Sequence, residues 1–401
     1  MSLAQASPVS LKALVVDDDP LLLALLEAFM ESRGYAVQGA RNGEEALARL
    51  EAGGFDVVVT DWHMPRMDGL ALCRAIRARP ADNYVYCVML TASVEEDALV
   101  AAMEAGVDDF VTKPLRPAEL GARLRAAERV LALQSGLANR NRELSEAYGQ
   151  LSRDLELARG LQQGQLPPPQ AFGRVRLEGM FEPSSFVGGD LYAYFAPSAR
   201  FLAFYLADIS GHGVAAAMMA VAAQHQLGEA TQQVVLGAAG GDRPRDIATR
   251  VVGEFNRRFL RLGESGLYLT LVFGLLDLEA GAAALVHAGH PPALFAAAGR
   301  TRFEPVGESG LPIGIVEQAD WDATEVPLQP GARLVLYSDG ITECRDGVRG
   351  EEYGQERLRQ LLHDSHAHGA AGACATAREA LRGWRGGAFE DDVTLLALEV
   401  R

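Results

Sequence analysis

The stretch that decides the fold reads FLAFYLADISGHG and occupies residues 201–213. Its apolar first part is typical of a buried β-strand, and the run stops at Asp208, just before a glycine-rich turn. A buried strand that stops at an aspartate delivers a carboxylate to one edge of a sheet. The C-terminal half repeats this arrangement, with an aspartate at the edge of a further apolar run, at Asp190, at Asp339 and at the adjacent pair Asp391 and Asp392.

These aspartate sites predict a metal centre. Carboxylates gathered at one rim of a sheet repel one another unless a cation shares them. Hard oxygen ligands of this kind suit Mg²⁺ or Mn²⁺. Two such ions can lower the pKa of a shared water enough to make it a nucleophile near neutral pH. The pattern therefore predicts metal-assisted hydrolysis of a phosphate ester.

Length and composition narrow the class of protein. A chain of 401 residues predicts two or three domains, and its formal net charge of −16 argues against a nucleic acid or an anionic membrane as a partner. The four cysteines form no CxxC motif, so buried thiols are favoured over zinc ligands or disulfides. Neither a secretory signal nor a membrane-spanning apolar run is visible, which favours a soluble cytoplasmic protein.

Residues 11–130 alternate short apolar strands with helical patterns, which predicts a five-stranded parallel sheet of the doubly wound α/β class. The strands are expected at residues 11–16, 35–39, 55–60, 85–90 and 109–112, and the helices at residues 21–33, 43–52, 70–77 and 94–105. In such folds, ligands bind beyond the carboxyl ends of the strands. Residues 1–10 precede the first strand and are expected to be disordered.

Residues 131–166 are predicted to be a helical linker, within a helical pattern that begins near Pro117 and ends near Gln165. Its seven-residue repeat consists of Leu137, Leu144, Leu151 and Ala158. An earlier apolar register, which ends at Leu131, is out of phase with this repeat, as at a coiled-coil stutter. The linker is interpreted as a dimeric coiled coil with Asn141 on its seam. A long amphipathic helix packed on its own domains is the alternative.

Residues 167–401 return to strands and predict an α+β or layered sandwich domain. The strands are expected at residues 175–181, 201–207, 267–276, 283–288, 333–337 and 393–400, with helices at residues 214–228 and 245–261. The stretches 237–244 and 364–372 are expected to be flexible loops. The second stretch carries part of an HxxHxH pattern made by His363, His366 and His368, for which a solvated loop is favoured over a transition-metal site.

The N-terminal domain has an acidic site of its own. Asp17 and Asp18 end the first predicted strand, Asp61 ends the third, Thr91 ends the fourth and Lys113 follows the fifth. Because these strands are parallel, all of these residues are expected at one edge of the sheet. Carboxylates beside a lysine and a hydroxyl can hold Mg²⁺ and accept a phosphoryl group.

Residues 11–130 resemble the receiver domain of two-component response regulators. The matching motifs are VVDDDP (15–20), DWHMPRMDG (61–69), LTA (90–92) and TKPL (112–115). The resemblance implies a CheY-like fold, phosphorylation of Asp61 by a cognate sensor histidine kinase, and one Mg²⁺ held by Asp17, Asp18, Asp61 and the backbone carbonyl of His63. It also implies that Thr91 and Phe110 are the switch pair and that Lys113 binds the phosphoryl group. Aspartates that only cap strands, or a receiver regulated without phosphate, are the alternatives.

Residues 155–401 resemble the SpoIIE/RsbU branch of the PPM (PP2C-like) Ser/Thr phosphatases. The matching motifs are VGGD (187–190), ADISGHGVAAA (207–217), AGHPP (288–292), GLPIG (310–314), YSDGITE (337–343) and DDVT (391–394). The resemblance implies an α-β-β-α sandwich and a metal-dependent protein phosphatase. It implies that Asp208 bridges two Mn²⁺ or Mg²⁺ ions, with the carbonyl of Ile209 as a further ligand. Asp339 and Asp391 would complete one ion's shell, and Asp190 would serve the other ion.

The two resemblances together imply a homodimeric response regulator whose phosphorylation controls a phosphoserine/phosphothreonine phosphatase. By analogy, its substrate is an anti-sigma-factor antagonist of the STAS type. One departure counts against this expectation, because Ala193 stands where many relatives carry an aspartate. The alternative function is therefore a phosphorylation-gated binding protein with a weak or inactive phosphatase domain. Neither His212 nor His290 is favoured as an acid catalyst.

Overall fold

The computed structural model describes residues 10–401 except 80–83, 93–95, 212, 240 and 263–265. The chain divides into an N-terminal unit, Met1–Gly149, and a C-terminal unit, Gln150–Arg401. The expected disorder of residues 1–10 falls almost wholly outside the described residues. Within the described ranges, no helix combines the length and the apolar character that a membrane span requires.

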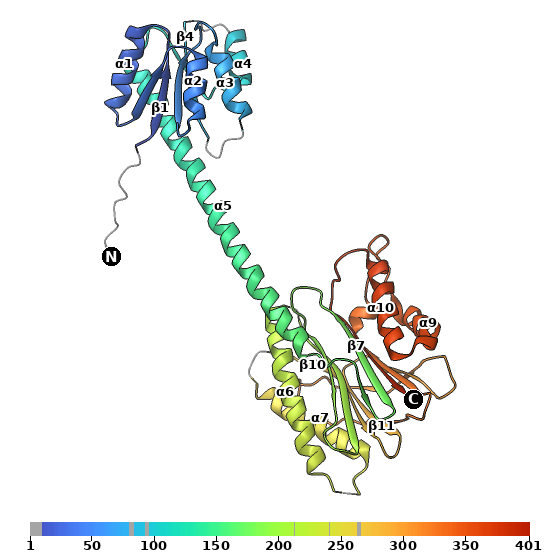
Figure 1. Cartoon of the computed structure of the whole chain (residues 1–401). Coiled ribbons are helices and arrows are strands. Elements are labelled where there is room, and N and C mark those ends of the chain that lie inside the picture. Colours follow the sequence, from blue (N-terminus) through green and yellow to red (C-terminus); the bar gives the residue numbers. More distant parts are fainter. Residues whose placement is uncertain (1–9, 80–83, 93–95, 212, 240, 263–265) are drawn as a thin grey trace. The chain divides into compact units, whose positions relative to one another are not determined.

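The N-terminal unit is a five-stranded parallel sheet flanked by helices, as predicted (Figure 1). The strand order is β2-β1-β3-β4-β5. The strands are β1 (Lys12–Val16), β2 (Ala36–Ala40), β3 (Val57–Asp61), β4 (Tyr86–Thr91) and β5 (Asp109–Thr112). The helices are α1 (Pro20–Glu31), α2 (Gly43–Glu51), α3 (Gly69–Ala78) and α4 (Glu96–Glu104). The ends of the predicted strands differ from these by no more than two residues.

Short polar side chains fix where the helices of this unit begin. The Asp19 carboxylate accepts a hydrogen bond from the Leu21 amide, and Pro20 occupies the first helical position of α1. Asn42 and Asp68 cap α2 and α3 in the same way. These caps fix the first residues of the helices that follow β1, β2 and β3. The carboxyl ends of the parallel strands lie at one edge of the sheet.

The long helix α5 (Pro117–Gln165) has 49 residues, which confirms the predicted helical segment. Its first turns bury Leu120, Leu124, Ala127 and Leu131 in the core of the N-terminal unit. Leu137, Leu144 and Leu151, which form the later repeat, are each more than half exposed. The change of register at Leu131 is therefore the point where α5 leaves the core of the N-terminal unit, and the interpretation as a coiled-coil stutter was wrong.

The C-terminal unit is a sandwich of two mainly antiparallel sheets, as predicted. The first sheet contains β8 (Asp190–Phe195), β9 (Phe201–Ile209), β10 (Leu269–Asp277), β11 (Ala282–Ala288), β14 (Ser309–Gly310) and β15 (Ala323–Pro327). The second contains β6 (Gln170–Phe172), β7 (Val175–Glu182), β12 (Ala293–Ala296), β13 (Glu304–Val306), β16 (Arg333–Tyr337) and β17 (Val393–Val400). The predicted strands lie within two residues of the observed ones, and the others were missed.

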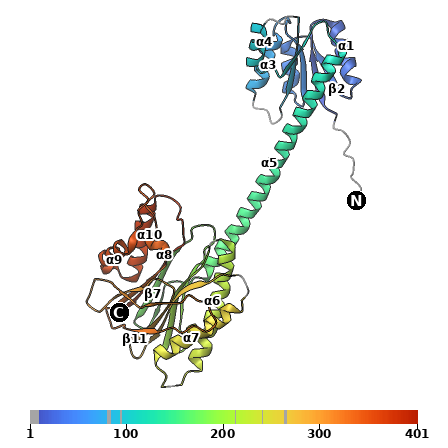
Figure 2. The same cartoon turned by 180° about the vertical axis from the view of Figure 1, so that it is seen from behind.

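Helices cover both outer faces of this sandwich (Figures 1 and 2). On the first sheet lie α6 (Val214–Leu236) and α7 (Pro244–Leu260), and on the second lie α9 (Gly354–Asp364) and α10 (Gly369–Arg385). Strand β9 is buried on both faces, because Phe204 and Leu206 enter the core between the sheets while Tyr205 and Ala207 face the helix layer. This burial explains its unbroken apolar run.

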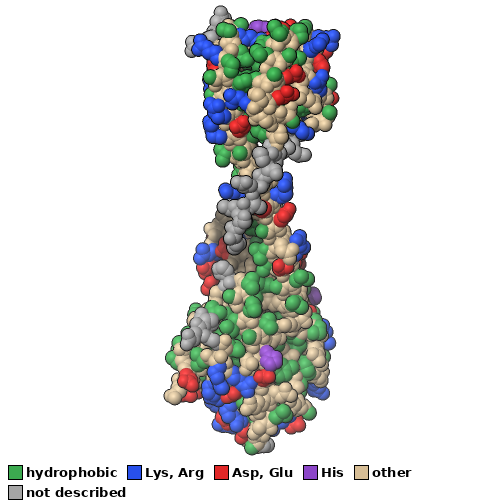
Figure 3. Space-filling model, turned by 90° about the vertical axis from the view of Figure 1, so that its left-hand side faces the viewer, with side chains coloured by type: hydrophobic (Ala, Val, Ile, Leu, Met, Phe, Trp, Pro, Cys, Tyr) green, Lys and Arg blue, Asp and Glu red, His purple; other side chains and the backbone are tan. Residues whose placement is uncertain are grey.

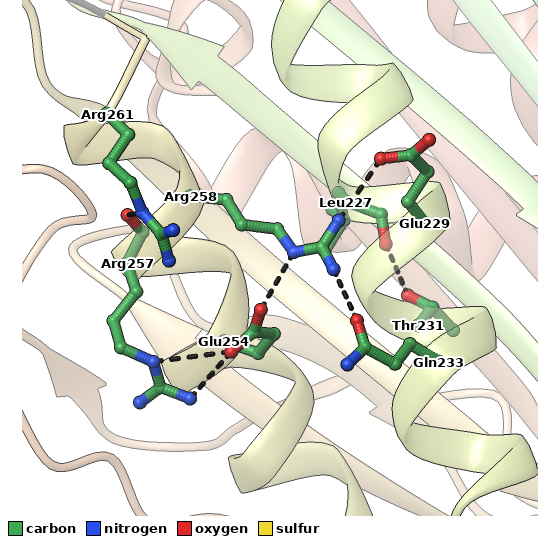
Figure 4. Close-up of polar contacts among 8 residues, drawn as sticks. All are labelled: Leu227, Glu229, Thr231, Gln233, Glu254, Arg257, Arg258 and Arg261. Atoms are coloured by element: carbon green, nitrogen blue, oxygen red, sulfur yellow. Dashed lines mark hydrogen bonds and ion pairs between the residues drawn. The ribbon is translucent and has the colours of Figure 1, made fainter.

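Polar contacts join α6 to α7 (Figure 4). The guanidinium of Arg258 on α7 donates to Glu254 on its own helix and to Glu229 and Gln233 on α6. The side chain of Arg258 is largely covered, so these charge-assisted contacts are stronger than those of an exposed pair. They join α6, which begins at Val214 after the glycine-rich turn that follows Asp208, to α7. Both helices pack on the first sheet.

The prediction of a flexible loop at residues 364–372 was wrong. A short 3-10 helix, η1 (Ser365–His368), connects α9 to α10, which begins at Gly369. The small residues that suggested a loop form a buried helical stripe of Ala370, Ala373, Cys374 and Ala377 against the second sheet. His363 ends up on α9, and in the described part of the chain the three histidines do not gather into a metal-binding group.

Candidate functional sites

The acidic site of the N-terminal unit is compact. The carboxylate oxygens of Asp17, Asp18 and Asp61 lie within 4.8 Å of one another, as metal ligands must. Lys113 Nζ lies 2.9 Å from Asp61 Oδ1 and 3.3 Å from Asp17 Oδ2. One lysine cannot neutralise three carboxylates, so the site retains negative charge that a divalent cation can balance. The residues present therefore fit Mg²⁺.

The pKa values of Asp17 and Lys113 reflect the same balance of negative and positive charge in this site. Burial raises the pKa of Asp17, and repulsion from Asp61 adds to it, although Lys113 opposes both effects. Burial disfavours the charged form of Lys113, but its ion pairs with Asp61 and Asp17 raise the pKa of its ammonium above the ordinary value. Lys113 therefore stays protonated at neutral pH and can bind an anionic group on Asp61.

The other predicted residues of this unit lie near the same edge of the sheet. Thr91 is buried at the end of β4, and Phe110 is half-buried in β5. His63 is exposed, which agrees with a role for its backbone carbonyl rather than its ring. A Cβ at position 69 would lie 2.1 Å from the Asp61 carbonyl oxygen, so only glycine lets α3 begin this close to the strand that carries Asp61.

The second site assembles aspartates from three distant segments of the C-terminal unit. Asp190 begins β8 and is paired across the sheet with Asp208 of β9. Asp339 begins the short helix α8 (Asp339–Thr342) after β16, and Asp391 lies just before β17. Asp208, Ile209 and Asp391 line a cleft of about 360 Å³, which we call the aspartate cleft. Asp190 is buried and Asp339 is half-buried, and both interact with Asp208.

Burial and mutual repulsion dominate the electrostatics of these carboxylates. Burial, followed by repulsion from Asp339 and Asp391, raises the pKa of Asp208 to about 8. Burial and the charge of Asp208 raise the pKa of Asp190 well above its ordinary value, and burial with Asp391 raises that of Asp339. No lysine or arginine is among the main influences on these three groups. Such uncompensated negative charge in oxygen donors fits Mn²⁺ or Mg²⁺.

Asp391 and Asp392 have different roles, which the sequence analysis did not separate. Asp391 is exposed at the cleft, whereas Asp392 is buried. The Asp392 carboxylate accepts hydrogen bonds from the backbone amide and hydroxyl of Ser184 (2.8 and 3.0 Å) and from the Gly189 amide (2.6 Å). A Cβ at position 188 would lie 2.2 Å from an Asp392 oxygen, so the adjacent glycines permit this approach. Asp392 therefore anchors the loop that carries Asp190.

Further polar residues hold Asp190 in place. The hydroxyl of Thr394 donates to the Asp190 carboxylate, and the hydroxyl of Ser338 accepts from the Thr394 amide at 3.0 Å. The motif DDVT therefore supplies a cleft carboxylate, a buried anchor and a hydroxyl donor within four residues. The alternation of consecutive side chains in an extended segment was the signal that could have revealed this division.

The two histidines and Ala193 also have defined surroundings. His290 is buried between Thr270 Oγ1 (2.7 Å) and the Tyr337 carbonyl (3.1 Å), and burial lowers its pKa to about 3. It therefore stays neutral and joins the two sheets.

Ala193 is buried in the hydrophobic core between the first sheet and its helices. His212 lies outside the described residues.

Two family models match the chain. The model of "Stage II sporulation protein E (SpoIIE)" matches residues 198–401, and the model of the response regulator receiver domain matches residues 13–125. The structure of the SiaA-PP2C domain of Pseudomonas aeruginosa is similar to 65% of this chain and 100% of that domain, with a TM-score of 0.53 and 20% identity. At this identity the similarity shows the fold alone.

Two relatives from Bacillus subtilis (strain 168) match part of the chain. The transcriptional regulatory protein ResD and the alkaline phosphatase synthesis transcriptional regulatory protein PhoP are each 40% identical over 115 residues. The match covers 29% of this chain and 47% of each relative. The chain thus spans about half the length of the curated relatives it matches.

The raised pKa of Asp208 predicts how pH affects the metal-free protein. Between the ordinary pKa of 3.8 and the folded-state value of about 8, the folded state binds protons more tightly than the unfolded state. The free energy of unfolding of the C-terminal unit should therefore fall as pH rises through this window. Thermal unfolding of the chelated protein should show a lower Tm near pH 8 than near pH 5, and Mn²⁺ should raise it most near pH 8.

The control is a protein with both Asp208→Asn and Asp339→Asn. It should lose most of the pH dependence and most of the Mn²⁺ effect on the C-terminal unit, while the site around Asp61 is untouched. A wild-type Tm that is insensitive to Mn²⁺, or that rises towards pH 8 without metal, would contradict the prediction.

Proposed function

The chain belongs to the Stage II sporulation protein E (SpoIIE) family, and on that premise we propose that it is a response regulator whose receiver controls a metal-dependent phosphoserine/phosphothreonine phosphatase. The observation that carries the proposal is the aspartate cleft, where burial and the charge of neighbouring carboxylates raise the pKa of Asp208 to about 8. We assign residues 11–130 to the receiver, 131–166 to the linker and 167–401 to the phosphatase.

Each residue of the phosphatase site has a proposed task. Asp208 would bridge two Mn²⁺ or Mg²⁺ ions, with the Ile209 carbonyl, Asp339 and Asp391 on one ion and Asp190 on the other. When bound, these ions would activate water and offset the charge of the phosphoryl group. Asp392 holds the backbone of the Asp190 loop, so the carboxylates keep their places when ions bind or leave.

The alternative is a phosphorylation-gated binding protein with an inactive phosphatase domain. Ala193 was the feature that favoured it. The burial of Ala193 in an apolar core, on the strand face that points to the helix layer, weakens that argument. An apolar residue there suits its surroundings, and the cleft keeps Asp208 and Asp391, with Asp339 close enough to raise the pKa of Asp208, without it.

The receiver is proposed to take a phosphoryl group from a sensor histidine kinase onto Asp61. Asp17 and Asp18 would hold Mg²⁺ beside it, and Lys113 would bind the phosphoryl oxygens, which its ion pair with Asp61 supports. The substrate of the phosphatase is proposed, by family analogy, to be an anti-sigma-factor antagonist of the STAS type. A comparison of phosphoproteins in host cells with and without this protein would identify it, and an unchanged antagonist would exclude that assignment.

The end of α5 offers a route by which the receiver could control the phosphatase site. The side chain of Gln162 is buried, and its amide donates to the Gly188 carbonyl at 2.7 Å and accepts from the Gly188 amide at 3.1 Å. Gly188 belongs to the loop that carries Asp190 and that Asp392 anchors. A shift or rotation of α5 would therefore act directly on the position of a proposed metal ligand.

Exposed apolar residues support the proposed homodimer. The repeat Leu137, Leu144 and Leu151 is exposed along α5, and an apolar groove of about 260 Å³ lies between the end of α5 and the start of α6. Met218 and Leu161 line this groove and are each more than two-thirds exposed. Figure 3 shows hydrophobic side chains gathered on a face of the C-terminal unit. A second copy of α5 would cover the leucine repeat.

Hydrolysis of p-nitrophenyl phosphate and of a phosphoseryl peptide with Mn²⁺ tests the enzymatic function. Asp208→Asn and Asp339→Asn should each lower kcat/KM by about a hundredfold or more, because a ligand that positions ions is lost. The matched control is Asp322→Asn, an exposed aspartate outside the cleft, which should keep wild-type rates. A wild type that hydrolyses neither substrate faster than the Asp208→Asn protein would refute the phosphatase.

The contact between Gln162 and Gly188 predicts a coupling defect. In the wild type, phosphorylation of Asp61 should change the phosphatase rate, and in Gln162→Ala the ratio of the two rates should move towards one. Two hydrogen bonds of about 1 kcal/mol each limit this loss of coupling to about thirtyfold. Gln163→Ala, at the exposed neighbouring position, should respond as the wild type does. A full response in Gln162→Ala would show that the signal takes another route.

Light scattering tests the dimer. The wild type should have the mass of two chains, and Leu144→Asp with Leu151→Asp should lower it, because charges on the apolar seam repel each other. The matched control is Ser145→Asp with Ser152→Asp, which adds the same charge at exposed positions beside the seam. A monomeric wild type, with Asp61 phosphorylated or not, would exclude the coiled-coil dimer.

A further inference from the structure

The lining of the aspartate cleft also contains basic residues. Besides Asp208 and Asp391, its lining includes the acidic residues Glu343 and Glu390 and two arginines, Arg345 and Arg385. A phosphomonoester carries a charge of about −1.5 to −2 at neutral pH and is repelled by carboxylates. These arginines are the basic side chains among the described residues that line the cleft. They are therefore the protein groups with the charge to attract such an ester.

Two segments that contribute to this lining are fixed against each other. One consists of Glu343–Gly347, after α8, and the other begins at the last residues of α10. Trp384 Nε1 donates to the Cys344 carbonyl at 3.2 Å, and the Gly347 amide donates to the Trp384 carbonyl at 3.4 Å. A Cβ at position 347 would lie 2.2 Å from the Arg385 carbonyl oxygen. This close packing sets the place of the Arg385 backbone relative to the cleft.

The side chain of Arg385 is held in one orientation. Gly386 ends α10 with a φ of +65°, so that the chain turns back beneath the guanidinium. Arg385 Nε then donates to the Ala388 carbonyl at 2.9 Å, and Nη2 donates to Glu390 at 2.9 Å. Within the described residues, the hydrogen bonds of this guanidinium are made by Nε and Nη2 and not by Nη1. A guanidinium fixed on one side and open on the other is suited to bind phosphoryl oxygens.

Arg345 is less well prepared for this task. Its side chain is 57% exposed, against 23% for Arg385, and its recorded ion pair is with Glu352 at 3.5 Å. An exposed arginine with few contacts loses more side-chain entropy when it binds a ligand, so it contributes less affinity. Because Arg385 is less exposed and more firmly held than Arg345, it is the better candidate for binding a phosphoryl group.

We propose that Arg385 is a substrate-binding residue of the cleft, which contacts the phosphoryl oxygens of the phosphomonoester through Nη1; this rests on the proposed phosphatase function. Asp208 and its neighbours would hold the ions, and Arg385 supplies a positive charge that belongs to the protein itself. The same contact binds inorganic phosphate, the product. The ligand class is a phosphomonoester dianion, whatever protein carries it.

The test compares full-length wild type with Arg385→Ala and Arg385→Lys in Mn²⁺. Loss of a hydrogen bond to a charged group should raise KM for p-nitrophenyl phosphate and for a phosphoseryl peptide by about tenfold to hundredfold. Competitive inhibition by inorganic phosphate should weaken by a similar factor. Arg385→Lys should recover part of both effects, since it keeps the charge and loses the planar fork.

Arg382→Ala is the matched control. Arg382 lies one turn earlier on α10, is paired with Glu182 at 2.9 Å and does not line the cleft, so its KM and phosphate inhibition should equal those of the wild type. Unchanged KM and phosphate inhibition in Arg385→Ala would overturn the inference and leave the phosphatase standing. A wild type as inert as Asp208→Asn would overturn the proposed function itself. If Arg385→Ala does not fold, the phosphate inhibition of Arg385→Lys decides, and a wild-type value would overturn the inference.

Discussion

Repulsion between buried carboxylates is the constraint on which the C-terminal unit depends. Asp190 and Asp208 face each other on neighbouring strands, and burial and their mutual charge raise the pKa of both. An arrangement of this kind survives only if rigid neighbours hold the backbone in place. Asp392 provides that support, because its own buried charge is satisfied by the Ser184 and Gly189 amides. One carboxylate thus stabilises the loop that presents another.

The two sites of the chain differ in how the negative charge of their carboxylates can be balanced. In the N-terminal unit, Lys113 reaches Asp61 and Asp17 directly, so part of the negative charge is neutralised within the protein. A carboxylate with the phosphoacceptor role proposed for Asp61 would benefit from a permanent positive neighbour. In the C-terminal unit, Asp208 has no such partner among its main influences, which leaves cations to balance the charge. The positive residues that line the cleft are Arg345 and Arg385, which are paired with Glu352 and Glu390.

Much of both folds could be predicted, because a strand that is buried on both faces consists of an unbroken run of apolar residues. Val57 to Val59 and Phe201 to Ala207 are buried on both sides and read as unbroken apolar runs. Helix α10 shows the limit of this approach. Its buried stripe is made of alanines, whose small apolar side chains do not separate a packed helix from a loop. The register change in α5 was visible, but its cause, the edge of the receiver core at Leu131, is a property of packing.

By itself, the sequence determined the strands that are long apolar runs, the two family resemblances and which aspartates lie at the edges of such runs. Only the tertiary structure decided which member of the Asp391–Asp392 pair faces the cleft, that Gln162 forms hydrogen bonds to Gly188, and that Arg385 lines the same cleft as Asp208. The physical reason is that apolar runs and turns are local, because they depend on neighbours in the chain. A carboxylate's partner, in contrast, is chosen by the approach of backbones some 200 residues apart, as Ser184 and Asp392 show. That approach follows from the pairing of β7 with β17, which places Glu182 opposite Val393 and which no single stretch of sequence contains.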